Sequence, residues 1–178
     1  MNLNLYFAWA AWITLCVIML SRPLLNIFKL KFLAPVVGKR KYLGWITGLA
    51  VVLHVMVYTV TFNQPLGFFL DPKYWDLGRA MGWGILALVI MIPLVLTSNT
   101  AAMKLLKKNW KRVQRLAYAF FIVAGIHIYM MGGKWLFTLL PMGIWAAAWI
   151  TAYIMKKRSV SSAVRAQSEK QSSAKNDD

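Results

Sequence analysis

The sequence is poor in cysteine, histidine and acidic residues. Its 178 residues include one Cys, two His and only five Asp and Glu. A single cysteine, Cys16, excludes a disulfide framework and a cysteine-based metal site, and so few carboxylates leave almost no candidates for an acid–base catalytic pair. No phosphate-binding loop or dinucleotide-binding glycine motif is present. We therefore expect no nicotinamide- or flavin-binding domain in this sequence.

Apolar residues, in contrast, are abundant. They make up 60% of the chain, whereas an ordinary soluble domain has about 45–50%. Five apolar runs approach the roughly 20 residues that a bilayer span requires. The runs are Leu5–Leu20, Leu43–Phe62, Met81–Leu96, Val113–Met131 and Trp135–Met155. The pattern predicts an all-α membrane protein, in which residues 1–158 form a bundle of about five transmembrane helices.

The basic residues predict how this bundle is oriented. The formal net charge is +16, but no nucleic-acid-binding motif accompanies it. Basic residues crowd the loop Arg22–Tyr42, the loop before Val113 and the start of the tail, whereas Asn63–Ala80 is balanced. The positive-inside rule then places the N-terminus outside and the C-terminus in the cytoplasm of a bacterial inner-membrane protein. We also expect Arg22–Tyr42 to lie along the inner membrane interface and the polar residues 159–178 to form a disordered cytoplasmic tail.

Both histidines, His54 and His127, lie inside predicted spans. An ionisable residue in a membrane span is costly and is a functional candidate for that reason. They lie about 11 and about 14 residues from the cytoplasmic starts of their spans, which at 1.5 Å per residue gives depths of roughly 17 and 21 Å. Two imidazoles at one depth in the outer half of the membrane suit the axial positions of one haem. The alternative is that each histidine only hydrogen-bonds to a neighbouring helix. A structural zinc site would want about four protein ligands.

Other residues near the two histidines are candidates for contact with the same ligand. Ala50 and Tyr58 share a helical face with His54, and Ala124 shares one with His127. The small alanines leave room for a flat macrocycle, and Tyr58 is a candidate contact of a haem or a quinone. The remaining candidates at the outer edge or in the spans are Trp83, Tyr129, Arg79 and Lys134. The two cations could hold haem propionates or dock an acidic partner, although ordinary anchoring at the membrane interface explains them as well.

Several short sequence motifs resemble those of the ferric-reductase-like transmembrane domain family. They are Lys41-Tyr42-Leu43-Gly44 with the following His54, Pro93-Leu94-Val95-Leu96-Thr97-Ser98-Asn99, and Trp110-Lys111-Arg112-Val113 with the following His127. Within the family, the sequence is similar to the haem-binding membrane subunits of bacterial periplasmic methionine sulfoxide reductase systems, over about residues 13–153. The resemblance implies a b-type haem with His54 and His127 as axial ligands. In two respects the chain departs from that pattern: Gln114 stands where the family block usually has a histidine, and the subfamily usually has one more helix before the first run.

These observations lead to a hypothesis about function. We expect a membrane b-type cytochrome that passes electrons from a quinol, through one haem, to a periplasmic acceptor such as a reductase subunit. A haem in the outer half, without a second one near the inner face, is poorly placed to take electrons from a soluble cytoplasmic donor. The competing hypothesis is a membrane protein without redox function, either an assembly subunit or a small transporter.

Overall fold

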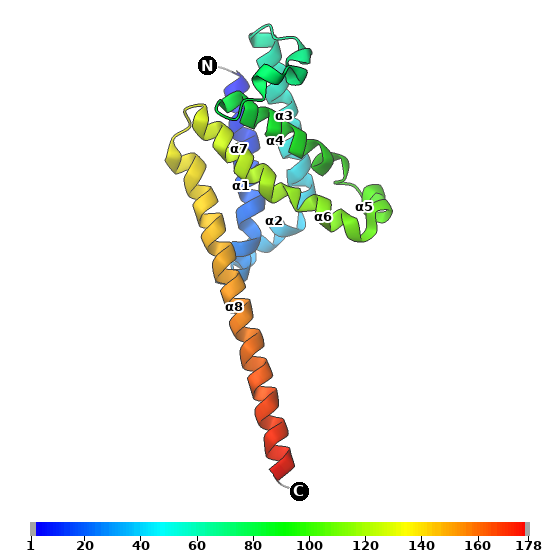
Figure 1. Ribbon diagram of the computed structural model, residues 1–178, viewed down its shortest axis with the longest axis vertical. Coiled ribbons are helices and arrows are strands. Elements are labelled where there is room, and N and C mark those ends of the chain that lie inside the picture. The colour runs from blue at the N-terminus through cyan, green and yellow to red at the C-terminus, as the bar shows by residue number, and fades with distance from the viewer. Residues whose placement is uncertain (1–2, 177–178) are drawn as a thin grey trace.

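The computed structural model describes residues 3–176, and this part of the chain contains helices and no strand. The helices are α1 (Leu3–Phe28), α2 (Ala34–Gly38), α3 (Arg40–Thr61), α4 (Ala80–Leu96), α5 (Thr100–Leu106), α6 (Trp110–Gln114), α7 (Leu116–Met130) and α8 (Trp135–Asn176). Short 3-10 turns, η1 (Lys31–Leu33), η2 (Leu66–Leu70), η3 (Pro72–Tyr74) and η4 (Lys107–Asn109), lie between them. Figure 1 shows α1 beginning at the top of the molecule and α8 running far below the other helices.

Four helical segments in the described residues are long and apolar enough to cross a membrane. They are Leu3–Phe28, Arg40–Thr61, Lys108–Met130 and Trp135–Ser162. A fifth span results if α4 and α5, which meet at a bend of 90°, are counted as one broken span. The predicted all-α bundle of about five membrane helices is therefore confirmed. The orientation of the termini stays a prediction.

The helices associate mainly as two antiparallel pairs. In the first pair, α1 and α3 are joined by the hydroxyls of Thr14 and Thr47, 2.8 Å apart. In the second pair, α4 packs on α7, and the hydroxyl oxygen of Thr97, directly after α4, accepts a hydrogen bond from Gln114 Nε2 of α6 at 2.9 Å. Helix α8 packs on α1 and α7. Figure 1 shows α4 and α7 side by side, crossing the direction of α1 and α3 at a slant.

An aromatic core joins the two pairs. The Trp12 ring stacks on Phe121 with centroids 5.2 Å apart, and its Nε1 donates to the carbonyl of Phe137 in α8 at 2.8 Å. Trp12 and Phe121 are almost completely buried. Many large apolar side chains on the outward faces of α1, α3, α4 and α8 are exposed instead, as expected where lipid, rather than protein, covers them.

Two helices are longer than the sequence predicts. Helix α1 continues past Leu20 to Phe28 and includes Pro23, so it takes in the first part of the segment expected to lie along the membrane interface. Helix α8 continues to Asn176 through residues predicted to be disordered. No glycine or proline follows Gly143, so nothing in the sequence interrupts the helix. A polar helix is only marginally stable on its own in water, and disorder of residues 159–178 in solution stays a prediction, of which residues 177–178 lie outside the described part of the chain.

Candidate functional site

A large cavity lies between the two helix pairs. Its volume is about 860 Å³, within the range typical of pockets for small molecules and cofactors. It lies toward the upper end of the bundle, which we define as the end that holds the first turns of α1 and α4 and the last turns of α3 and α7 (top of Figure 1). Both histidines line this cavity, and most of the other lining residues are apolar.

Each histidine is anchored to the neighbouring helix of its own pair. His54 Nδ1 lies 3.1 Å from the carbonyl oxygen of Asn4, in the first turn of α1. His127 Nδ1 lies 2.8 Å from the carbonyl oxygen of Ala80, in the first turn of α4. A carbonyl oxygen only accepts hydrogen bonds, so Nδ1 must be the protonated nitrogen in both rings. In a neutral imidazole the lone pair available to a metal is then on Nε2.

Neither Nε2 takes part in any hydrogen bond found among residues 3–176. Anchoring Nδ1 to a carbonyl oxygen is how proteins commonly orient a metal-ligating imidazole. The sequence allowed the alternative that each histidine only hydrogen-bonds to a neighbouring helix, and those bonds are indeed present. They use one nitrogen of each ring, however, and leave the second nitrogen free of hydrogen bonds to the described residues, in two histidines that line one cavity.

A glycine makes room for the ring of His127. A Cβ atom added to Gly84 of α4 would lie 2.8 Å from Cε1 and 3.0 Å from Nδ1 of that ring, closer than real Cβ atoms approach. The imidazole therefore lies directly on the backbone of α4. This contact was not predicted, because the sequence does not reveal which helix packs against which. The Gly82-Trp83-Gly84 spacing in the first turns of α4 was the available signal.

The donor set fits a haem better than a bare metal ion. No group of three or more His, Cys, Asp or Glu side chains is placed to hold a metal among the described residues. A haem needs only the two axial ligands from the protein, because the porphyrin supplies the others. An apolar cavity with one imidazole from each helix pair meets that need.

Other residues predicted for the site fall into two groups. Tyr58 and Ala124 line the cavity, as does Lys134. Ala50 is buried but does not belong to the lining. It lies one turn from Thr47, whose hydroxyl contacts α1, and so its side of α3 is turned toward α1.

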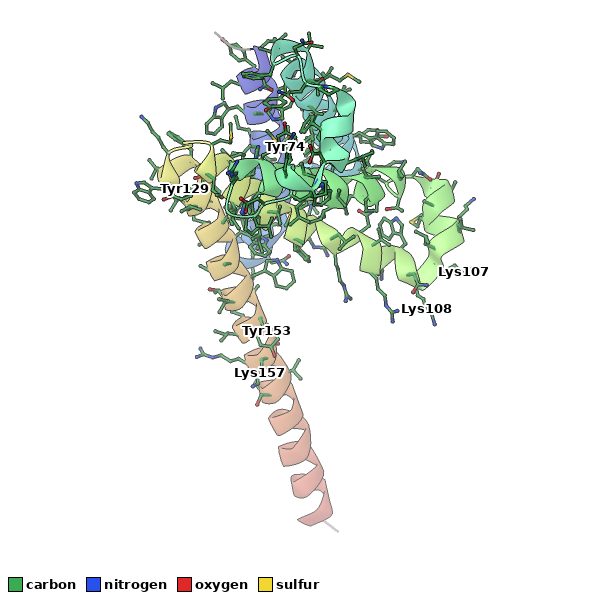
Figure 2. All side chains as sticks on the ribbon, turned by 45° about the horizontal axis from the view of Figure 1, so that its top comes forward. Tyr74, Lys107, Lys108, Tyr129, Tyr153 and Lys157 are labelled. Atoms are coloured by element: carbon green, nitrogen blue, oxygen red, sulfur yellow. The ribbon has the colours of Figure 1, made fainter. Side chains whose placement is uncertain are left out.

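Three further candidates lie outside the lining. Arg79 precedes α4, is exposed, and pairs with Asp76 at 3.3 Å. The indole of Trp83 donates to the carbonyl of Leu77 at 2.8 Å. Tyr129 is about half exposed, near the turn between α7 and α8 (Figure 2).

The loop between α3 and α4 covers the upper end of the cavity with aromatic rings. Phe68 is buried, lies 4.0 Å from Phe69 between ring centroids, and both residues line the cavity. Figure 2, turned so that the top comes forward, shows Tyr74 of this loop in front of the bundle. Hydrogen bonds from Lys73 to the carboxylate of Asp71 hold the pKa of Asp71 below its ordinary value and stabilise the turn η3.

Two comparisons with known proteins agree with this architecture. Residues 7–125 match the model of the family described as "Ferric reductase like transmembrane component". The chain is also 32% identical, over 118 residues, to "Protein-methionine-sulfoxide reductase heme-binding subunit MsrQ" of Agrobacterium fabrum. That alignment covers 64% of this chain and 50% of the relative, so the chain spans about half the length of the curated relative that it matches. No solved structure matches the chain significantly.

The matched region contains α3 and α4 completely, α1 from Phe7 onward, and most of α7, up to two residues before His127. It therefore covers His54 and both antiparallel pairs. Together with the membrane-spanning helices, the match identifies a multi-pass protein of the inner membrane. The chain belongs to the ferric reductase like transmembrane component family.

Proposed function

We propose that this chain is a haem-binding, electron-transfer subunit of a membrane oxidoreductase system. The observation that carries the proposal is the shared cavity, in which two histidines from different helix pairs are each anchored through Nδ1. The relative from Agrobacterium fabrum is named as a heme-binding subunit, which supports the same cofactor here.

The residues of the cavity have distinct roles in this proposal. His54 and His127 would hold the haem iron through Nε2, and the carbonyls of Asn4 and Ala80 orient both imidazoles by accepting the Nδ1 proton. Ala124 and the backbone at Gly84 leave room beside the rings, and Tyr58 forms part of the wall. When bound, a b-type haem supplies one-electron redox chemistry. The apolar walls exclude water. Because the dielectric constant is then low, a charge that appears in the site without a partner is energetically costly.

We further propose that the electron donor is a membrane quinol. The chain has only two histidines, and both are used at the upper end of the bundle. At the opposite end, Gln114 Nε2 of α6 donates a hydrogen bond to the Thr97 hydroxyl at the end of α4. A glutamine amide is not an iron ligand for a haem in place of an imidazole, so this end has no evident relay for electrons from a soluble cytoplasmic protein. A quinol reaches the haem from within the membrane and needs no such relay.

The proposed acceptor lies at the outer face of the membrane. With the N-terminus outside, the upper end of the bundle faces the periplasm, and the loop between α3 and α4 lies between the cavity and that compartment. A periplasmic redox partner, such as a methionine sulfoxide reductase subunit, would be reduced there. The name of the relative supports this kind of partner, and the cavity position supports this direction of exit.

A reduced-minus-oxidised absorption spectrum of the purified protein tests the proposal. The wild-type chain should show the bands of a low-spin b-type haem with two imidazole ligands, and His54→Ala and His127→Ala should each lose them. Gln114→Ala is the matched control, because it removes a polar side chain of α6 that does not line the cavity, and it should keep the spectrum. A colourless wild-type protein, or a low-spin spectrum that survives both histidine changes, would refute the proposal.

A further inference from the structure

One cationic side chain lies at the cavity. Among the described residues of the lining, Lys134 alone carries a formal charge at neutral pH. It follows the turn between α7 and α8, seven residues after His127 in the sequence. The same turn therefore places a proposed iron ligand and a cation at one ligand-binding cavity.

The glycines before Lys134 fix where this residue lies. Helix α7 ends in a Schellman motif. The amide of Gly132 donates to the carbonyl oxygen of Tyr129 at 3.0 Å, and the amide of Gly133 donates to the carbonyl oxygen of Ile128 at 2.9 Å. Gly132 has φ +88°, a conformation that favours glycine. A Cβ atom on Gly133 would lie 2.6 Å from the carbonyl oxygen of Ile128. The turn is therefore compact, and the backbone of the next residue is held at the mouth of the cavity.

The first turn of α8 holds the Lys134 backbone from the other side. Its carbonyl oxygen accepts hydrogen bonds from the Thr138 hydroxyl at 3.1 Å and from the Phe137 amide at 2.9 Å. Thr138 is fully buried. The lysine side chain itself is exposed, so a fixed backbone carries a flexible four-carbon stem that ends in a positive charge.

The polar atoms of the cavity gather at the same end. Asn4, in the first turn of α1, lines the cavity and its side-chain Oδ1 is buried without a hydrogen-bond partner. An amide can present either oxygen or nitrogen, so this group suits a polar edge of a ligand. The cavity also extends to Leu15, Ala87 and Phe120, deeper in the helices, where its lining is apolar. The cavity thus has a polar, cationic end and an apolar end, which matches a ligand with an apolar body and an anionic edge.

We propose that Lys134 is the counter-cation of the haem carboxylates, and that it orients the haem with its carboxylate edge toward the upper mouth of the cavity. This inference rests on the proposed haem-binding function. Arg79, the other cation considered for this role, pairs with Asp76 and lies outside the lining. It offers a matched control on the same face of the molecule.

Binding of haem and of haem dimethyl ester, whose carboxylates are neutralised, tests the assignment. The full-length apoprotein is titrated in detergent with each ligand. The wild-type chain should bind haem more tightly than the ester, by about fivefold, as expected for a partly exposed ion pair. The ratio of the two affinities should fall toward one in Lys134→Gln and in the apolar variant Lys134→Met. It should stay at the wild-type value in Lys134→Arg and in Arg79→Gln.

The outcomes separate the two proposals. An unchanged preference in folded Lys134→Gln or Lys134→Met would overturn the role of Lys134, and so would an equal loss in Arg79→Gln. A wild-type protein that gives no low-spin spectrum with either ligand would instead overturn the haem-binding function itself. If both neutral variants fail to fold, the wild-type preference decides: it should weaken as salt screens the ion pair, and a preference that salt leaves unchanged counts against the proposal.

Discussion

The two imidazoles use backbone carbonyls, rather than carboxylates, as their orienting partners. Five acidic residues occur in the chain, and none lies within the membrane-spanning helices. Asn4 and Ala80 instead offer a main-chain oxygen, so orienting the two rings requires no further charge inside the bilayer. Each ring then holds a proton on Nδ1, so that in its neutral form Nε2 carries the lone pair that a haem iron binds.

The contact between Gly84 and the ring of His127 leads to a specific prediction. Gly84→Ala should displace the ring from its position and lower the affinity for haem by about tenfold or more, the range found when residues that support a metal ligand are changed. Gly44→Ala is the matched control, since a Cβ atom at Gly44 meets nothing within 4 Å. Haem titration of both apoproteins measures the difference.

Equal affinities in the two glycine variants would contradict this packing. Alanine raises helix stability at an open position by up to about 1 kcal/mol, so Gly44→Ala should also unfold at the same temperature as the wild type or higher. A fall in thermal stability for both variants would mean that the loss of haem reflects general unfolding.

Sequence analysis was more successful in selecting the two histidines than in selecting the residues that surround them. The scarcity of histidine and the similar depths of His54 and His127 led to both residues, and the structure brings them to one cavity. Periodicity also suggested Ala50, but a helical face is too broad to separate the side toward α1 from the side toward the cavity. Lys134 and Arg79 were both candidates from the sequence, and only the structure separates them, because Lys134 lines the cavity and Arg79 does not. Gly84 was not predicted, because its role depends on which helices pack together, and this is set by contacts distant in the sequence.

Among the helices, the bend between α4 and α5 is the main feature that the sequence did not predict. The end of the apolar run at Leu96 was placed correctly, but the 90° change of direction was not foreseen. Hydroxyls of Thr97 and Ser98 donate back to carbonyls of the last turn of α4, at 2.6 and 2.5 Å. Polar residues that bond to the nearby backbone compete with the continuing helix, so the bend is local in origin.

Asn99 is the N-cap of α5, and replacing its side chain tests how much this cap stabilises the helix. Its side-chain oxygen accepts a hydrogen bond from the Ala102 amide at 2.7 Å. Asn99→Ala should destabilise α5 by about 1 kcal/mol, seen as faster amide hydrogen exchange confined to residues 100–106. Asn109→Ala is the control, because Asn109 precedes α6 without such a bond. Similar exchange in both variants would show that the cap does not stabilise α5.

In the whole molecule, most basic residues lie at the opposite end of the helices from the histidines, whereas Lys73, Arg79 and Lys134 lie at the histidine end. Both histidines lie near the ends of α3 and α7, whereas Arg40 begins α3 and Lys111 and Arg112 precede α7. Figure 2 shows Lys107 and Lys108 on the arm formed by α5 and η4, away from the bundle, and Lys157 far along α8. This separation is what the positive-inside rule requires if the cavity lies in the outer half of the membrane.

Labelling of single cysteines tests that orientation directly. In a Cys16→Ser background, which removes the chain's one cysteine, Lys73→Cys reports on the loop above the cavity and Lys157→Cys on α8. Both lysines are exposed. A membrane-impermeant maleimide should label Lys73→Cys in intact spheroplasts, and Lys157→Cys only after permeabilisation, while the Cys16→Ser parent stays unlabelled. The reverse pattern would place the cavity next to the cytoplasm. Reduction by a soluble cytoplasmic donor would then become feasible, and the proposed periplasmic acceptor would have to be abandoned.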